Sequence, residues 1–203
     1  MSNSLTVRRT QAERTRASRE KIIEAATELF SQQGFRGAKM ADIAKAADLT
    51  EPGLLHHFPS KTALLTAVLA ERDRTNDERF HIYLAGEKQD LLASLLRLAE
   101  HNETVPGLVQ LFTILAAESI QEQHPGHDFF QRRYEAVRAQ GVAVLRQAQA
   151  RGDVRVDLTA EDLIVMVFAM MDGLQIQWLY DPDKIDMARI FGQFVRLLKV
   201  EPS

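Results

Sequence analysis

The chain contains no cysteine among its 203 residues, and it has only ten glycines and six prolines. Without cysteine there can be no disulfide, no thiolate metal site and no cysteine nucleophile, so the chain suits a reducing cytoplasm. The glycines and prolines stand at intervals between long periodic runs, which is typical of a mostly or entirely helical protein. The sequence therefore predicts an all-α fold.

Long hydrophobic runs are also missing. No apolar segment follows the opening MSNSLTVRR, and the most apolar run, LIVMVFAMM from Leu163, is bounded by Glu161, Asp162 and Asp172. A run of this length is too short to span a bilayer, and the N-terminus does not have the pattern of a secretory signal. We therefore expect a soluble, cytoplasmic protein with no membrane partner.

Charge is unevenly distributed, although the net charge is only −3. Residues 1–61 hold ten Lys and Arg against seven Asp and Glu, a net of +3, so the remainder carries −6. The segment 1–21 alone has six basic and two acidic residues, a net of +4. A basic head on an acidic body suggests that only the head meets a polyanion, although charged N-termini are commonly just solvated.

The periodicity of apolar residues predicts nine helices. The first runs from about residue 11 to 33 with Gly34 as its C-terminal cap, and two short helices follow, from Met40 to Asp48 and from Thr50 to Phe58. A long helix from residue 60 to about 84 comes next, and five more are expected at 88–102, 107–123, 128–151, 160–180 and 184–199.

The two short helices, over MADIAKAADLTEPGLLHHF, have the pattern of a helix-turn-helix. Thr50 is a good N-cap, and Pro52 falls in the first turn, where its missing N–H costs nothing. The expected buried side consists of Ile43, Ala44, Leu49 and Leu54. The small side chain of Ala44 lets the two helices cross closely, and the second helix is left with an exposed face that could enter a DNA major groove.

The first sixty-odd residues contain IIEAATELFSQQGF, MADIAKAADLT and GLLHHFPSKTALL in this order and spacing, and they resemble the TetR/AcrR family of bacterial transcription factors. The resemblance implies an all-helical homodimer. Residues 1–60 would form a three-helix domain that binds operator DNA, and residues 61–203 a helical domain that dimerises and binds a small-molecule effector. It implies no cofactor, and it favours a repressor that the effector releases from its operator.

The resemblance also assigns residues to DNA. The helix that begins with Thr50, Glu51, Pro52 and Gly53 would be the recognition helix, with His56 facing the groove and His57 near a phosphate. The expected contacts outside this helix are Arg8, Arg9, Arg14, Lys39 and Lys61, the last of which matches the family's common phosphate-binding lysine. Glu51 could accept a hydrogen bond from cytosine N4, or it could simply favour the helix N-terminus.

Two positions depart from the family's pattern. Leu55 stands where members often have a tyrosine that contacts phosphate, and Asp48 replaces the usual glycine of the turn. Aspartate tolerates left-handed dihedral angles better than most residues, so we expect the turn to survive. Leu55 and Glu51 keep one alternative open, which is an all-helical ligand-binding or protein-interaction module without DNA binding.

The body offers candidate residues for the effector and for a second copy of the chain. The expected ligand pocket is lined by Phe80, Tyr83, Phe112, Leu115, Met166, Met170 and Trp178, although such residues often serve only in packing. The expected dimer interface, whose members could instead be intramolecular core, consists of Ala169, Gly173, Gln177, Ile190, Phe191, Phe194 and Leu198. Asp172 and Gln175 are polar groups in an apolar helix and must find partners.

Metal binding and catalysis have little support in the sequence. His56 and His57 are adjacent on a helix and point about 100° apart, with no third ligand nearby. His124 and His127 flank a turn and could chelate more readily, yet a surface loop is the simpler interpretation. The sequence has no paired Glu-x-x-His motif, glycine-rich phosphate loop or nucleophile elbow, so we do not expect an enzyme.

Overall fold

The computed structural model describes residues 10–84 and 90–200, without the side chains of 76–84. Within these ranges the chain folds into nine helices, and the only β pairing is an isolated antiparallel bridge between Val154 and Lys199. The helices are α1 (Gln11–Gly37), α2 (Met40–Ala46), α3 (Glu51–His57), α4 (Lys61–Leu84), α5 (Leu91–Glu103), α6 (Pro106–Glu118), α7 (His127–Ala150), α8 (Ala160–Tyr180) and α9 (Met187–Leu198). The predicted all-α fold is confirmed.

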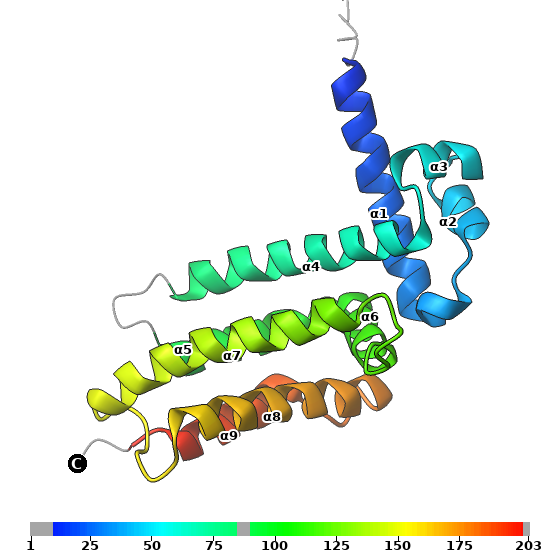
Figure 1. Ribbon diagram of the computed structural model, residues 1–203. Helices are drawn as coiled ribbons and strands as arrows, with labels where there is room; N and C mark the ends of the chain where they lie inside the picture. The colour runs from blue at the N-terminus through cyan, green and yellow to red at the C-terminus, as the bar shows by residue number, and fades with distance from the viewer. Residues whose placement is uncertain (1–9, 85–89, 201–203) are drawn as a thin grey trace, which may run out of the picture.

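Figure 1 shows a head and a body joined by one long helix. The head contains α1, α2 and α3, and α4 begins in the head and runs along the body formed by α5 to α9. Within the body, α7 packs against α8, and α5 packs against α9. Helix α1 also packs against α6, so the head contacts the body directly as well as through α4.

Two clusters of buried apolar residues form the core. The second cluster lies within the body, between α5, α7, α8 and α9. The first cluster fills the head around Phe30, Ile43 and Leu54, all fully buried, and it continues into the body through Leu111, Phe112, Leu115 and Phe130. The head and the near end of the body therefore share one core across the expected boundary at residue 60.

Helix α1 extends beyond its predicted end. Gly34 has φ 69° and ψ 178°, a conformation that glycine adopts readily, so a break occurs at the expected residue. The chain then makes one more turn to Gly37, and the N–H of Ala38 donates to the Gly34 carbonyl over 3.4 Å. The predicted break at Gly34 is confirmed, and one more helical turn follows it to Gly37.

Helices α5, α6 and α9 are among those shorter than predicted, and side-chain caps explain the starts of α5 and α9. Asp90 caps the start of α5 by accepting from the N–H of Ala93 over 3.0 Å, and Asp186 caps the start of α9 by accepting from the N–H of Arg189 over 2.8 Å. Helix α6 ends at Glu118 instead of residue 123, because the following residues form turns around His124.

Helix α8 is the one helix of the described chain that is long and apolar enough to cross a membrane by length and composition alone. Its most apolar window is 39% buried within the fold, and its residues Leu163, Val167 and Leu174 belong to the second core cluster. A core helix of a folded domain passes the same test, so this helix is weak support for a membrane span.

Candidate nucleic-acid interface

The turn between α2 and α3 depends on a left-handed residue. Asp48 has φ 59°, and it is the one residue other than glycine with positive φ among the described residues. After it, the N–H of Leu49 donates to the carbonyl of Ala44 over 2.9 Å, which closes the end of α2. The expectation that aspartate would tolerate the turn in place of glycine is confirmed.

Helix α3 begins as the sequence predicts. Thr50 accepts a hydrogen bond on its Oγ1 from the N–H of Gly53 over 3.2 Å, and Pro52 lies in the first turn. A cap of this kind contributes about 1 kcal/mol to helix stability. For a helix of seven residues, too short to be stable alone, the cap matters to whether the helix forms at all.

The rest of α3 is held from beneath by the first core cluster and by α1. Leu54 is fully buried, and Phe58, which follows the helix, is nearly so. Arg19 of α1 donates to the carbonyl of His57 over 2.9 Å, and its guanidinium lies 4.3 Å from the centroid of the Phe58 ring. A cation at the C-terminus of a helix also interacts favourably with the helix dipole. Arg19 therefore positions α3, a role that its place in a basic segment did not reveal.

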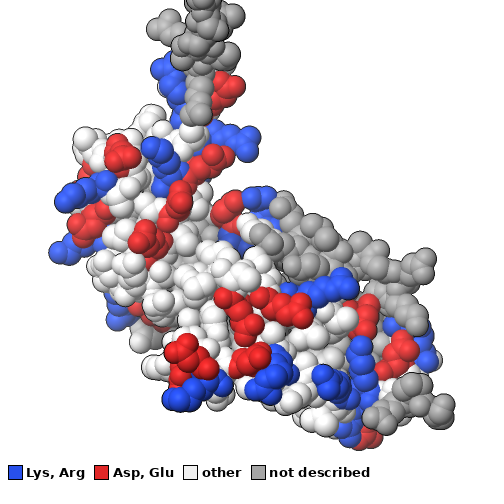
Figure 2. All heavy atoms as spheres, turned by 180° about the vertical axis from the view of Figure 1, so that it is seen from behind, with Lys and Arg blue, Asp and Glu red and all other residues white. Residues whose placement is uncertain are grey.

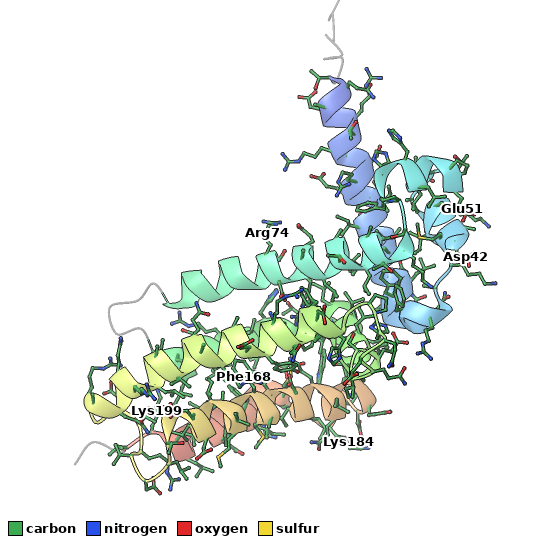
Figure 3. All side chains as sticks on the ribbon, viewed as in Figure 1. Asp42, Glu51, Arg74, Phe168, Lys184 and Lys199 are labelled. Carbon is green, nitrogen blue, oxygen red and sulfur yellow. The ribbon has the colours of Figure 1, made fainter. Side chains whose placement is uncertain are left out.

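The outer face of α3 is exposed. Thr50, Glu51, Pro52 and His56 are exposed, while Gly53 and His57 are half-buried, and Figure 3 shows Glu51 at the outer edge of the head. Leu55, in the position of the family's tyrosine, is 39% exposed. Residues capable of base contacts therefore share one short, supported helix. The position of Glu51 agrees with both of its proposed roles.

Two further expected DNA contacts lie within the described residues. Lys39 is the exposed N-cap residue of α2, and Arg14 is exposed in the first turns of α1. Arg8 and Arg9 lie outside the described residues. Figure 2 shows acidic and basic side chains interspersed over the rear of the molecule, without a broad patch of one sign there.

The expected phosphate contacts at His57 and Lys61 acquire specific environments. Burial, His56 and Arg19 lower the pKa of His57, which favours its neutral form in the absence of DNA. Lys61 is half-buried, and its ammonium donates to the carbonyl of Arg36 over 3.2 Å and lies 4.8 Å from the Phe35 ring centroid. An ammonium has three donors, so Lys61 keeps donors for a phosphate besides the one that it gives to Arg36.

The C-terminal end of α1 is bound to the body at one junction. Glu118, the last residue of α6, accepts a hydrogen bond on Oε2 from the N–H of Phe35 over 2.7 Å. Next to it, Arg36 donates to Oε1 of Gln121 over 2.7 Å. A Cβ on Gly34 would overlap Oε1 of Glu118, so this carboxylate would have to move, and the positive φ of 69° also favours glycine there. We call this contact between Gly34–Arg36 and Glu118–Gln121 the α1–α6 junction.

His124 completes the junction from inside. It is buried, with its ring 5.1 Å from the ring of Phe35 between centroids. Its Nδ1 accepts from the N–H of Gly126 over 3.1 Å and shares a hydrogen bond of 2.9 Å with Ser119 Oγ. Its Nε2 lies 3.8 Å from a Glu118 oxygen. The interpretation of the HPGH segment as a simple surface loop was therefore wrong for His124, which packs into the fold instead.

The residues expected around a ligand pocket do not share one environment. Phe112 and Leu115 are buried in the first cluster, Trp178 is buried in the second, and Met170 is half-buried. Met166 is 45% exposed on α8 and is not part of the buried core. The side chains of Phe80 and Tyr83 lie outside the described residues.

The residues expected at a dimer interface divide in the same way. Phe191 and Leu198 are buried within the chain's own second cluster, which favours the alternative that they are intramolecular core. Ala169 and Gln177 are exposed, and Gly173, Ile190 and Phe194 are half-buried. The exposed part of α8 also carries large apolar side chains: Val165, Met166, Ile176 and Tyr180. We call this exposed apolar side the outer face of α8.

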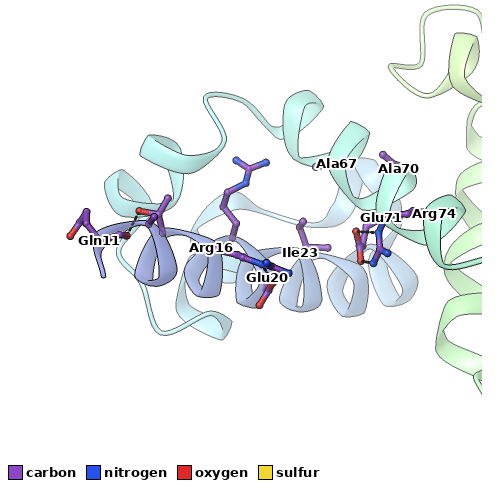
Figure 4. A pocket seen from close by; sticks show the side chains of 11 residues that line it. Gln11, Arg16, Glu20, Ile23, Ala67, Ala70, Glu71 and Arg74 are labelled. Atoms are coloured by element: carbon purple, nitrogen blue, oxygen red, sulfur yellow. Dashed lines mark hydrogen bonds and ion pairs between the residues drawn. The ribbon is translucent and has the colours of Figure 1, made fainter. Parts of the chain in front are cut away.

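An open groove of about 910 Å³ lies between α1 and α4 (Figure 4). Arg16 pairs with Glu20 at 2.9 Å and Arg74 pairs with Glu71 at 2.5 Å, so ion pairs within each helix line its walls. Ile23 lies between them. Because the groove carries both signs of charge already paired, it is not arranged to bind a polyanion.

Comparisons with known proteins agree with this architecture. The family model for bacterial regulatory proteins of the tetR family matches residues 22–68, and the model for the C-terminal part of BetI-type transcriptional repressors matches residues 88–198. The chain is 32% identical over 190 residues to the HTH-type transcriptional regulator TtgR of Pseudomonas putida, which covers 89% of each protein.

Two solved structures have the same fold. NalD, described as the secondary repressor of a multidrug efflux pump in Pseudomonas aeruginosa, matches with a TM-score of 0.69 and 21% identity, over 93% of this chain and all of NalD. The SmeT–triclosan complex matches with a TM-score of 0.76 and 17% identity, over 92% of this chain and 93% of SmeT. At these identities the structures support the fold alone.

The helix-turn-helix and the matches along the chain define a DNA-binding transcriptional regulator and not an enzyme. The second family model alone covers more than half of the chain. The chain belongs to the TetR family of bacterial transcriptional regulators.

Proposed function

We propose that the protein is a cytoplasmic homodimeric repressor that binds a palindromic operator and releases it when a small molecule binds in the body. The observation that carries the DNA-binding part is the short helix α3, capped by Thr50 and held beneath by Leu54 and Arg19, with its outer face exposed. Bases would be read from Thr50 to Gly53 and by His56, while Lys39, Lys61 and the basic residues of the N-terminal segment would contact phosphates.

The outer face of α8 supports the homodimer. Val165 is 51% exposed, Ile176 is 45% exposed and Tyr180 is 88% exposed, and exposed apolar stripes of this extent on a soluble protein commonly mark an interface. Pairing of two such faces, with Ile190 and Phe194 of α9 beside them, would form a four-helix interface. Two recognition helices about 34 Å apart would then meet successive turns of one DNA face, which supplies the specificity that one short helix lacks.

The α1–α6 junction supports release by an effector. A molecule bound between the body helices would alter DNA affinity only if it favours one arrangement of the head over another. Glu118 and Gln121 bind the end of α1 directly, so a shift of α6 would reach the head without passing through α4. The SmeT structure contains triclosan, which gives a precedent for a small molecule bound to a protein of this fold.

The function can be tested by selecting bound sequences from random DNA and then measuring binding of the enriched sequences in gel shifts. A two-fold symmetric consensus is expected, together with dimer-sized complexes. If no sequence is enriched, or if the protein binds a consensus without symmetry as a monomer, the proposal is wrong. A ligand that binds tightly but leaves operator affinity unchanged would remove the effector part of it.

Two substitutions separate contacts to DNA phosphates from contacts to bases. Lys61→Ala should weaken binding to operator and to random duplex alike and reduce the slope of log K against log salt by about 1. Lys184→Ala is the matched control, because Lys184 lies on the far side of the body (Figure 3) in a surface pair with Asp181. Glu51→Gln should change the preferred sequence and leave the salt dependence intact. An unchanged salt slope for Lys61→Ala would contradict its phosphate contact.

A further inference from the structure

Two arginines meet inside the body, between α4, α7 and the middle of α6. Arg72 of α4 and Arg133 of α7 have side chains only 9% and 17% exposed. Both guanidinium groups lie over the ring of buried Phe112, at 3.8 Å and 5.3 Å from its centroid. Figure 3 shows side chains filling the space between these helices. Two buried like charges against one ring are costly unless something else compensates them.

The compensation within the described residues is incomplete. Arg72 donates to Oδ1 of Asp73 over 3.3 Å, and Arg133 donates to the same oxygen over 2.6 Å. Among the described residues, each arginine therefore makes one side-chain hydrogen bond, although a guanidinium has five N–H donors. One carboxylate oxygen therefore serves two cations.

The second nearby carboxylate is already engaged. Asp172 of α8 accepts a hydrogen bond from the hydroxyl of Tyr134 over 2.8 Å, and among the described residues it forms no ion pair with either arginine. Burial raises the pKa of Asp172, which favours its neutral form. Burial and the neighbouring Arg133 lower the pKa of Arg72 to about 9. Both arginines therefore share a cluster with Asp73 and Asp172, and they carry more N–H donors than these carboxylates accept.

The remaining donors of both arginines border accessible space. Among the described residues, His124 Nε2 is the one fully buried side-chain nitrogen or oxygen without a hydrogen-bond partner. The unbonded guanidinium nitrogens of Arg72 and Arg133 must then touch space that a water molecule reaches. Unused guanidinium donors beside an aromatic ring are features with which proteins bind carboxylates.

We propose that Arg72, Arg133 and Phe112 form a site for the carboxylate of an organic acid with an apolar or aromatic body. The carboxylate would accept the unused N–H donors of the two arginines, and its apolar part would extend between the body helices. This acid would be the effector of the proposed repressor. Its effect on operator binding rests on the proposed function, whereas its binding to the body does not depend on DNA. The arginines on α4 and α7 would draw these two helices together around the acid.

The first test measures binding without DNA. Benzoate, 3-phenylpropionate and octanoate would be titrated against the full chain near neutral pH, each beside its primary amide, by calorimetry and by the fluorescence of Trp178, the chain's single tryptophan. At least one acid is expected to bind with Kd below about 1 mM, and its amide at least about 10-fold more weakly. If none of the acids binds, or if the amide binds equally well, the proposal is overturned.

The second test uses Arg133→Gln with Arg132→Gln as the matched control, since Arg132 is the neighbouring residue of α7 but is exposed. Arg133→Gln should raise the Kd of the acid about 10- to 100-fold, whereas the control should change it less than about 2-fold. Without ligand, Arg133→Gln should melt within about 2 °C of the wild type. Loss of the Arg133 charge relieves its repulsion with Arg72, while the ion pair between Asp73 and Arg72 remains.

A purely structural ion pair predicts the opposite pattern. In that case Arg133→Gln would lower the ligand-free Tm by more than about 6 °C and leave binding of the acid unchanged, and the proposal would be overturned. Arg133→Lys, which keeps the charge but not the planar fork, should recover part of the affinity. If the protein binds the acid but no operator, the carboxylate site is supported and the repressor function is not. Failure of the site and failure of the repressor function can therefore be told apart.

Discussion

The α1–α6 junction permits a quantitative test through Gly34→Ala. The alanine would have to adopt φ 69° and ψ 178°, which costs about 1–3 kcal/mol for a residue other than glycine. Its Cβ would also overlap Oε1 of Glu118 and displace this carboxylate from the N–H of Phe35. Loss of a hydrogen bond to a charged group costs about 1.5–3 kcal/mol in addition.

Gly152→Ala is the matched control for this substitution. Gly152 also has positive φ, 77°, but nothing lies within 4 Å of a Cβ built there. It therefore imposes backbone strain without a collision. We expect Gly34→Ala to be less stable than Gly152→Ala by about 2 kcal/mol, which corresponds to about 4–8 °C in Tm for a chain of this size.

Calorimetric melting of the two variants and of Glu118→Ala provides the measurement. Glu118→Ala should destabilise the wild type by about 2 kcal/mol but have little further effect once Gly34 is alanine, because both changes remove the same hydrogen bond. If the two glycine variants melt within about 1 °C of each other, or if the effects of Gly34→Ala and Glu118→Ala simply add, the Glu118 contact does not stabilise the junction and the reasoning fails.

Three further outcomes are expected. Leu54→Ala should lower the free energy of unfolding by about 2–5 kcal/mol in urea titrations, since Leu54 is fully buried beneath α3, whereas exposed Leu55→Ala should change it by less than about 0.5 kcal/mol. Burial lowers the pKa of His124 below its usual 6.5, so the unfolded chain takes up the proton at a higher pH than the folded chain. The free energy of unfolding should therefore fall as the pH drops below about 7. His124→Gln should flatten this dependence on pH, and an unchanged dependence would contradict the role of His124. Ile176→Asp on the outer face of α8 should shift the protein to monomer in sedimentation equilibrium, and a persistent dimer would assign the interface elsewhere.

The sequence predicted the parts of the fold that depend on neighbours along the chain. Thr50 was identified as an N-cap because its hydroxyl reaches an N–H three residues later, and the left-handed turn at Asp48 followed from the tolerance of aspartate. Helix α8 was predicted at its observed bounds, 160–180. These features depend on local geometry, which residue type and spacing specify directly.

Features made by residues distant in sequence could not be predicted in this way. Arg19 caps α3 across 38 positions, Arg133 reaches Asp73 across 60, and Phe35 donates to Glu118 across 83. In the sequence each looks like an ordinary charged or aromatic surface residue. Apolar composition also could not distinguish which sides of α8 and α9 face the core: Met166 of α8, expected in a pocket, is exposed, and Phe191 of α9, expected at an interface, is buried.

The shared core of head and body has a consequence for how this protein can be divided. Leu111, Leu115 and Phe130 of the body pack in the same cluster as Ile43 and Leu54 of the head. A fragment ending at residue 60 would therefore expose apolar surface that the intact chain covers, and it should express as a poorly folded peptide. Swapping heads between relatives would meet the same obstacle, because each graft must carry matching side chains on α6 and α7 to seat correctly.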